Sequence, residues 1–324
     1  MNLRARALPS LAAALLAGTA PAADRPLVIA HRGASGYLPE HTLAAKALAF
    51  GMGADALEQD LVLSRDGVPV VLHDVQIDTV TDVARRFPGR ARADGRFYAI
   101  DFTVAELRQL AVNERISLKT GRPVFPGRFP EGPTALRIVT FEEELRFLQG
   151  LSRSTARQVG IYPELKQPAW HREQGKDLAA AVLPLLAKYG YATKADPCHV
   201  QCFEFDELRR VRTELGYKGR LVLLFGAEPK DVSLEDVARI ADGIGPSIKA
   251  VVADGPGGAA QVTGLVRRAH ALNLVVHPYT ARADELPKWA VSIDDLHRQV
   301  LVEAGADGLF TDFPDLTSAF VRRK

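Results

Sequence analysis

The sequence is poor in cysteine, carries almost no excess charge and, beyond its first residues, has no long apolar run. Its 324 residues include two cysteines, 26 glycines and 20 prolines, which excludes disulfide-stapled and collagen-like chains. With 41 basic and 39 acidic side chains, it lacks the charge excess of a typical nucleic-acid-binding protein. At this length we expect a folded protein whose core is stable without a metal or a disulfide.

Residues 1–22 have the pattern of a cleavable signal peptide. Arg4 and Arg6 precede a short apolar run, and Ala20-Pro21-Ala22 matches an A-x-A cleavage site. The run is too short for a transmembrane helix, and no cysteine follows the cleavage site, so we expect neither a membrane span nor a lipid anchor. Cleavage would remove two of the 41 basic side chains and leave a mature chain near neutrality.

The two cysteines, Cys198 and Cys202, lie four residues apart in a segment with the pattern of a β-strand. That separation places their Cα atoms about 13 Å apart, roughly twice the span of a disulfide. Although export would permit a disulfide, we therefore predict two free thiols on one strand face in the core. The same geometry argues against a metal site built from both cysteines and His199.

From residue 25 onward, short β-branched runs alternate with helical stretches, which is typical of a parallel sheet with crossover helices. The candidate strands are Leu27–His31, Ala56–Leu63, Pro69–His73, Gly160–Lys166, His199–Phe203, Leu221–Phe225, Ala250–Ala253, Leu274–Tyr279 and Gly308–Asp312. The second and third are too close for a crossover, so we expect a hairpin there, with one strand outside an eight-stranded barrel. Helices are expected at Thr42–Met52, Gly175–Tyr189, Asp206–Leu215, Leu234–Asp242, Gln261–Leu272 and Ile293–Ala304.

A (β/α)8 barrel needs about 250 residues, so the mature chain 23–324 has roughly 50 to spare. The excess falls at 75–138, a segment rich in Arg, Gly, Pro and Phe that follows a strand end. We predict a single barrel domain in which this loop-rich insertion lies over the barrel mouth as a lid. Thr103 with Glu106, and Thr140 with Glu143, have the spacing of capping boxes that start helices.

Alternation along Leu57–Leu63 puts Glu58, Asp60 and Val62 on one strand face and the leucines with Gln59 on the other. If the leucines meet the outer helices, the two carboxylates point into the barrel, where they are costly unless a cation compensates them. The alternative is an edge strand with a solvated acidic face.

The segment Ile161–Lys166 repeats this arrangement, with Tyr162, Glu164 and Lys166 on one face. A third inward carboxylate then joins the first two. Three carboxylates without histidine or cysteine favour a hard cation, Ca²⁺ or Mg²⁺, over zinc. The alternative is a simple Glu164–Lys166 ion pair on a solvated strand.

His31 and His73 each end an apolar strand, at the barrel end where active sites form. Two such histidines favour an acid–base pair, although a single one is more often structural. Arg32 offers a planar fork for a phosphate or carboxylate, the alternative being an exposed ion pair.

Six segments together resemble the glycerophosphodiester phosphodiesterase family, and more narrowly its periplasmic, calcium-dependent bacterial branch. They are His31–Thr42, Leu57–Asp60, Asp66–Asp74, Tyr162–Lys166, His277–Thr280 and Gly308–Pro314. The similarity covers essentially the whole mature chain, and the ordered His-Arg-Gly, Glu-x-Asp and His-Asp motifs are its most specific part.

The resemblance implies a TIM barrel of the phospholipase C-like phosphodiesterase type. The implied residues are a catalytic pair, His31 and His73; metal ligands, Glu58, Asp60 and Glu164; and phosphate-binding residues, Arg32 and Lys166. The expected cofactor is a divalent cation, Ca²⁺ or alternatively Mg²⁺. Glu40 matches a family acid near the metal, and His41 marks the periplasmic branch.

The implied reaction is hydrolysis of a glycerophosphodiester, such as glycerophosphocholine or glycerophosphoethanolamine, to sn-glycerol 3-phosphate and an alcohol. We expect a periplasmic enzyme whose partner is this small substrate, without nucleic acid or a stable membrane anchor; a homodimer is compatible with the sequence. Two alternatives are open: a phosphodiesterase of the same fold that acts on lipid or teichoic-acid-type polymers, and a non-enzymatic binding protein that keeps the site as a relic.

Overall fold

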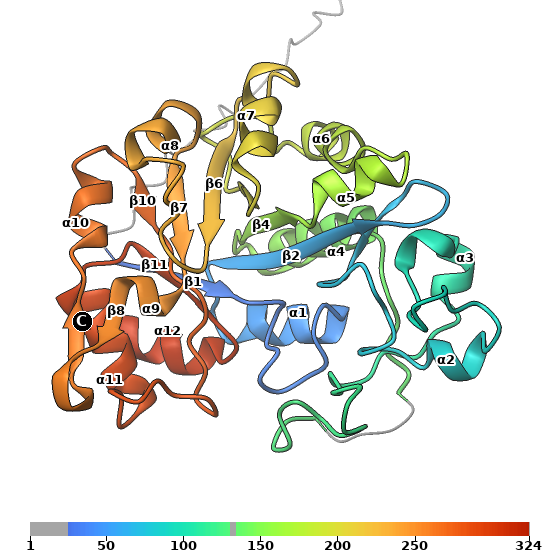
Figure 1. Ribbon diagram of the computed structural model, residues 1–324, viewed down its shortest axis with the longest axis horizontal. Coiled ribbons are helices and arrows are strands. Elements are labelled where there is room, and N and C mark those ends of the chain that lie inside the picture. Colours follow the sequence, from blue (N-terminus) through green and yellow to red (C-terminus); the bar gives the residue numbers. More distant parts are fainter. Residues whose placement is uncertain (1–24, 130–133, 324) are drawn as a thin grey trace, which may run out of the picture.

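The computed structural model describes residues 25–129 and 134–323, so the predicted signal peptide lies outside the described residues. Eight parallel strands form a barrel with helices around it (Figure 1). Their order is β10-β7-β6-β5-β4-β2-β1-β11. The strands are β1 (Leu27–Ala30), β2 (Ala56–Leu63), β4 (Gly160–Leu165), β5 (His199–Cys202), β6 (Arg220–Phe225), β7 (Gly243–Pro246), β10 (Val275–Val276) and β11 (Gly308–Thr311).

The sheet closes on itself where β10 approaches β11. The Asp307 N–H donates to the Val276 carbonyl at 3.0 Å, and the Phe310 N–H donates to the Pro278 carbonyl at 2.9 Å. On the opposite side of β11 lies β1, so the first and last barrel strands are neighbours. This arrangement confirms the predicted TIM barrel, and it brings the residues that follow β1, β2, β4 and β11 to one mouth.

The helices of the outer layer begin at side chains that cap backbone amides. Thr42 accepts from the Ala45 N–H at the start of α1, and Thr140 with Glu143 forms the predicted capping box of α4. The larger helices are α1 (Leu43–Gly51), α4 (Phe141–Thr155), α5 (Pro168–Glu173), α6 (Leu178–Lys188), α7 (Phe205–Thr213), α8 (Leu234–Ile240), α10 (Leu265–His270), α11 (Ile293–His297) and α12 (Pro314–Arg322).

The predicted hairpin is present, because β3 (Pro69–Val71) pairs antiparallel with β2 and lies off the barrel path. The prediction of a barrel strand at Ala250–Ala253 is wrong. Helix α9 (Ile248–Val251) occupies part of that segment, and β8 (Val252–Asp254) pairs antiparallel with β9 (Ala260–Val262) in a separate small sheet.

The barrel strand absent from the prediction is β7, whose sequence is Gly-Ile-Gly-Pro. Such a segment has no β-branched run, yet its glycines are needed for packing. A Cβ on Gly243 would lie 2.6 Å from Val275 Cγ2, and one on Gly245 would lie 2.5 Å from Leu224 Cδ2. Neighbouring side chains thus take the space that β7 leaves free.

Two predicted helices are shorter than expected. The segment Gln261–Leu272 begins in β9, and its helix starts only at Leu265. The segment Ile293–Ala304 consists of α11 followed by a π-helical turn at Arg298–Glu303.

The core has an outer layer between strands and helices and a small inner cluster inside the barrel. The leucines of β2 belong to the outer layer, as the alternation predicts, and Cys198 and Cys202 are buried there as free thiols. The inner cluster consists of Ile29, Ala56, Tyr162, Val222 and Phe310. Because these apolar residues fill the barrel, the charged site residues gather above them, at the mouth.

The segment 75–138 contains α2 (Val83–Arg86), a 3₁₀ turn at Ala99–Asp101 and α3 (Val104–Leu107), which starts at the predicted capping box. Its side chains form a hydrophobic cluster of their own with Val62 of β2, so the insertion is packed onto the β2–β3 hairpin. Figure 1 shows it in cyan and green beside the end of β2.

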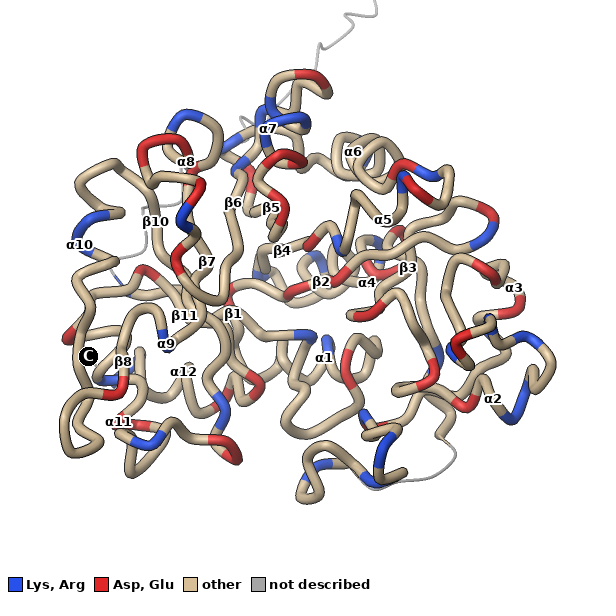
Figure 2. The backbone as a smooth tube through the Cα atoms, in the orientation of Figure 1, with Lys and Arg blue, Asp and Glu red and all other residues tan. Residues whose placement is uncertain are grey.

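Figure 2 shows blue and red segments interspersed along the described chain, in keeping with its nearly balanced charge.

Within residues 25–129 and 134–323, none of the helices has the length and hydropathy that a membrane crossing requires.

Candidate active site

Three carboxylates meet at the barrel mouth. Glu58 and Asp60 project from β2 and Glu164 from β4, where the parallel register sets Asp60 opposite Glu164. All three side chains are buried, and one oxygen from each lies within 4.8 Å of the others. The structure thus brings the three predicted ligands together at a single point.

Burial and mutual repulsion act on these groups together. Burial, followed by the charge of Asp60, raises the pKa of Glu58 well above its usual value. Burial likewise raises the pKa of Glu164 to about 8, against the opposing effect of Lys166. Burial would also raise the pKa of Asp60, but the charges of Lys166 and His73 hold it well below its usual value.

The donor set fits a divalent cation. Asp60 Oδ1 is buried and has no hydrogen-bond partner among the described residues. Gln201, on β5, donates from Nε2 to Glu58 Oε1 at 3.0 Å and so orients that carboxylate. Because every available ligand is an oxygen, this trio can hold a hard cation, which would relieve the repulsion among the carboxylates.

Each predicted catalytic histidine is bound through Nδ1 to an aspartate. His31 lies 2.6 Å from Asp312 Oδ1, and His73 lies 2.6 Å from Asp74 Oδ1. Because an ionised carboxylate only accepts hydrogen bonds, each Nδ1 carries the proton. Each Nε2 is then free to accept one, and that of His31 lies 3.8 Å from Glu58 Oε2.

Both imidazoles are neutral near pH 7. Burial, followed by the charge of Arg32, lowers the pKa of His31 to about 3 and that of His73 to about 4. The pKa of Asp312 is also lowered, but for another reason. Burial would raise it, and the contact with His31 together with the nearby guanidinium groups outweighs that effect and keeps the carboxylate ionised. Either histidine can therefore accept a proton without first losing one.

Arg32 and Lys166 flank the carboxylates with positive charge. Lys166 Nζ lies 2.8 Å from Glu164 Oε1 and 3.7 Å from Asp60 Oδ1. Arg32 Nε lies 3.5 Å from Asp60 Oδ2 but has no hydrogen-bond partner among the described residues, so a bound anion would satisfy this buried donor. These positions suit a phosphate beside the carboxylate trio.

The turn after β1 is tight. Arg32 has a φ of 59°, and its backbone N–H donates to Glu58 Oε2 at 2.9 Å. The next residue must be glycine, because Gly33 has a φ of 91° and a Cβ there would lie 2.8 Å from the Ala45 backbone. The His-Arg-Gly motif thus ties β1 to a metal-ligand candidate on β2.

Glu40 and His41 lie beside the site rather than in the carboxylate trio. Glu40 accepts from Arg32 Nη1 at 2.8 Å and so holds the arginine that faces the carboxylates. His41 Nε2 lies 2.7 Å from Asp60 Oδ2 and fixes the orientation of that carboxylate. Both therefore act on predicted site residues through hydrogen bonds.

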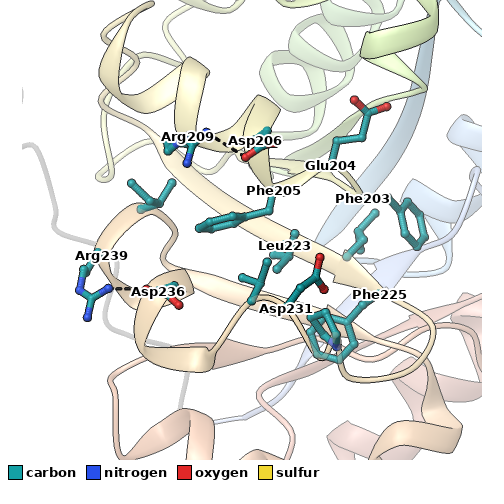
Figure 3. A pocket seen from close by; sticks show the side chains of 14 residues that line it. Phe203, Glu204, Phe205, Asp206, Arg209, Leu223, Phe225, Asp231, Asp236 and Arg239 are labelled. Carbon is teal, nitrogen blue, oxygen red and sulfur yellow. Dashed lines mark hydrogen bonds and ion pairs between the residues drawn. The ribbon is translucent and has the colours of Figure 1, made fainter.

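The carboxylates, both histidines, Arg32 and Lys166 line one pocket of about 120 Å³. A larger hollow of about 770 Å³ lies beside it and shares Phe203 and Leu224 with it. Figure 3 shows the larger hollow, in which Asp206 pairs with Arg209 and Asp236 with Arg239. Its charged groups are largely paired with each other, whereas those of the smaller pocket face a common point.

Several residues of the site were assigned no role from the sequence. Asp312 directly follows β11, and Asp74 directly follows His73. Gln201 lies in β5 between Val200 and Cys202, and all three residues are buried. For the two aspartates, the available signal was their place near strand ends within the family motifs. Gln201 lies outside those motifs, and nothing local shows which residue either aspartate or Gln201 contacts. Arg282 donates to Asp312 Oδ2 at 2.8 Å, and no motif or spacing in the sequence indicated this contact.

A barrel with carboxylates, imidazoles and cationic side chains at the carboxyl ends of its strands defines an enzyme for an anionic substrate. The profile of the Glycerophosphoryl diester phosphodiesterase family matches residues 31–316. A glycerophosphodiester phosphodiesterase of Haemophilus influenzae is 41% identical, with 99% of each chain covered. One of Treponema pallidum is 38% identical and covers 95% of this chain and 94% of its own. The chain belongs to the glycerophosphoryl diester phosphodiesterase family, as the sequence motifs predict.

Solved structures share the fold. The structure described as a glycerophosphoryl diester phosphodiesterase of Silicibacter pomeroyi is 25% identical in sequence to this chain. Its TM-score is 0.72, and the match covers 92% of this chain and 94% of its own. A phosphodiesterase of Oleispira antarctica, in complex with its product sn-glycerol-3-phosphate, has a TM-score of 0.66 at 21% identity, over 92% and 97% of the two chains.

Proposed function

We propose that this enzyme hydrolyses glycerophosphodiesters, such as glycerophosphocholine and glycerophosphoethanolamine, to sn-glycerol 3-phosphate and an alcohol with a bound divalent cation. The observation that carries the proposal is the convergence of Glu58, Asp60 and Glu164 in one pocket with His31 and His73. The family membership and the product named for the Oleispira antarctica structure support it.

Glu58, Asp60 and Glu164 would hold the cation; we expect Ca²⁺, which accepts oxygen ligands in flexible geometry, with the more strictly octahedral Mg²⁺ as the alternative. When bound, the ion supplies positive charge where negative charge grows on the phosphate oxygens during the reaction. Arg32 and Lys166 add hydrogen bonds to the same oxygens, and they bind the diester and its more negative transition state.

The two histidines perform the proton transfers. One neutral imidazole removes a proton through Nε2 from the attacking water, or from the glycerol hydroxyl of the substrate, in which case a cyclic phosphate forms and water then opens it to sn-glycerol 3-phosphate. The other imidazole, protonated once the anionic diester is beside it, donates a proton to the departing alcohol. Asp74 and Asp312 keep both Nδ1 atoms protonated, which aims each Nε2 at the substrate.

We further propose that the enzyme works in the periplasm, on the basis of the signal-peptide pattern in residues 1–22. Fractionation of cells that make the full chain, with a truncation to residues 23–324 as control, tests this location. The full chain should appear in the periplasmic fraction and the truncation in the cytosol. A full chain that stays in the cytosol with the truncation would contradict export.

The decisive assay measures sn-glycerol 3-phosphate release from several glycerophosphodiesters, with EDTA and then with single metals added back. We expect turnover of glycerophosphocholine and glycerophosphoethanolamine, loss of activity with EDTA, and recovery with Ca²⁺. The melting temperature in EDTA should fall only modestly, because the large core folds without the ion. Activity that EDTA leaves unchanged would contradict a catalytic metal, and preference for a polymer would favour the alternative substrate class.

A further inference from the structure

The two aspartates that bind the histidines are themselves bound by arginines of the insertion. Asp312 Oδ2 accepts from Arg128 Nη2 at 2.7 Å, and Asp74 Oδ2 accepts from Arg115 Nη1 at 2.5 Å. Each His–Asp pair thus continues to a guanidinium that comes from the segment 75–138. The same chain of groups, imidazole to carboxylate to arginine, is built twice.

Resting on the proposed function, we propose that Arg115 and Arg128 are positioning residues through which the insertion completes the acid–base apparatus. Each one holds the carboxylate that keeps a catalytic imidazole in its working tautomer and orientation. The insertion is then more than a cover, because without it both aspartates would lose a fixed hydrogen-bond partner.

The surroundings of Arg128 suit this role. Its side chain is only 5% exposed, and the guanidinium is packed 3.7 Å from the centre of the Phe125 ring. A second carboxylate, that of Asp284, accepts from Arg128 Nε at 2.8 Å, which fixes the plane of the guanidinium group. From this position a single Nη2 reaches Asp312, so Arg128 acts on His31 through that carboxylate.

Arg115 has two duties. Besides binding Asp74, its Nη2 and Nε donate to both oxygens of Glu40 at 2.6 and 3.1 Å. Glu40 in turn holds Arg32, the predicted phosphate ligand. Loss of Arg115 should therefore disturb both His73 and phosphate binding, whereas loss of Arg128 should disturb His31 alone.

The other insertion arginines supply a control. Arg96 forms a two-pronged ion pair with Asp78, at 2.6 and 2.7 Å, inside the insertion. Among the described residues of the insertion, only Arg115 and Arg128 contact a carboxylate that binds His31 or His73. Arg96→Gln thus removes a two-pronged ion pair within the insertion without removing a hydrogen bond to Asp74 or Asp312.

The test compares Arg115→Ala, Arg128→Ala and Arg96→Gln with the parent enzyme, with Arg115→Lys and Arg128→Lys as second variants where alanine prevents folding. We expect Arg128→Ala to lower kcat about 10- to 100-fold with little change in KM, and Arg115→Ala to lower kcat and raise KM. Guanidinium ion should restore part of the lost activity of the alanine variants, and Arg96→Gln should keep the kcat of the parent.

Leaving-group dependence separates positioning from structural support. With a p-nitrophenyl diester of glycerol phosphate, the departing nitrophenolate needs no proton, so a variant that impairs the general acid should lose little activity. One arginine should therefore show a much smaller defect with this substrate than with glycerophosphocholine. Equal defects of both arginine variants on both substrates, without guanidinium rescue, would overturn the proposal.

Proton NMR provides a readout that does not depend on turnover. The Nδ1 protons of His31 and His73, each in a 2.6 Å contact with a carboxylate, should give far-downfield signals, assigned with His31→Ala and His73→Ala. Arg128→Ala should shift the His31 signal, Arg115→Ala the His73 signal, and Arg96→Gln neither. Unchanged signals in both variants would refute the proposal even if the parent enzyme showed no diesterase activity, a result that would count separately against the proposed function.

Discussion

Strand β2 contributes to two buried polar clusters, one on each of its faces, and the two clusters differ in charge balance and in access to a pocket. On the inner face, Glu58 and Asp60 join Glu164 at the barrel mouth. On the outer face, Gln59 and Lys46 both donate to Glu144 Oε1 at 2.8 Å, between the strand and its helices. Glu58, Gln59 and Asp60 alternate along this one strand and belong to different clusters, so secondary structure alone does not separate the clusters.

Charge balance and access make the difference. The outer cluster sets one cation against one carboxylate, and Gln59, Lys46 and Glu144 are all fully buried. Glu144 Oε2 lacks a partner among the described residues, as Asp60 Oδ1 does, so an unsatisfied oxygen is not in itself the mark of a site. The inner cluster instead sets several carboxylates around one point and opens to a pocket. Surplus charge of one sign that faces an accessible space is thus the feature that identifies the site.

The largest effect should come from the histidines beside the inner cluster. His31→Ala and His73→Ala should each lower kcat about 10²- to 10⁴-fold, because each removes one proton transfer. Steady-state assays and melting curves measure this, with His297→Gln, a buried histidine bound to Thr317, as a control that keeps kcat. A histidine variant that retained more than a few per cent of turnover would disprove the acid–base pair.

Removal of one inner carboxylate should be nearly as damaging to activity. Glu164→Gln keeps the shape of the side chain but removes one of three charged ligands for the cation, so we expect about a 10²- to 10³-fold loss of turnover. Calcium titration by calorimetry should show weakened binding, while the melting temperature in EDTA stays close to that of the parent. Undiminished calcium affinity would exclude Glu164 as a ligand.

The outer carboxylate should behave in the opposite way. Glu144→Gln leaves Lys46 buried without a countercharge, which should cost about 3 to 5 kcal/mol of unfolding free energy, measured in urea. The kcat of the folded protein should not change. If Lys46→Met combined with Glu144→Leu recovers the lost stability, charge balance and not shape explains the outer cluster; a kcat that falls with Glu144→Gln would break the contrast between the two faces.

A smaller, pH-dependent effect is expected from Glu114, a buried carboxyl of the insertion with one oxygen that lacks a partner among the described residues. Burial, followed by the charge of Glu40, raises its pKa from 4.5 to about 7. Between those pH values the folded state binds the extra proton, so the stability contributed by this group is complete below pH 4.5 and is lost as pH rises through 7.

Glu114→Gln removes this titration. The variant and the parent should unfold alike at about pH 4, and at about pH 8 the variant should be more stable by about 2 to 4 kcal/mol. Urea denaturation at the two pH values measures the difference. A parent whose stability relative to the variant is the same at both pH values would show that Glu114 ionises normally.

The sequence predicts those parts of the fold and site that depend on neighbours along the chain. Alternation alone orients Glu58, Asp60 and Glu164 correctly, and the short link to Pro69 predicts the β2–β3 hairpin. Strand β7 escapes prediction because its glycines are selected by Val275 and Leu224, which are distant in sequence.

The supporting contacts of the site escape for the same reason. Asp312 lies 184 residues from Arg128, so no local pattern could pair them. The pairing arises because the barrel brings the end of β11 to the mouth that the insertion also reaches. Candidate reactive groups are thus visible in strand motifs, whereas the groups that contact them depend on how the closed barrel brings distant segments together.

The most direct test is a crystal structure of the protein grown with excess calcium and the product sn-glycerol 3-phosphate. One ion should lie among Glu58, Asp60 and Glu164, with oxygen distances of about 2.3 to 2.6 Å, and with His31 and His73 on either side of the bound diester or product. Oxygens too far apart to share one ion, or calcium bound elsewhere while enzymatic activity persists, would contradict the account.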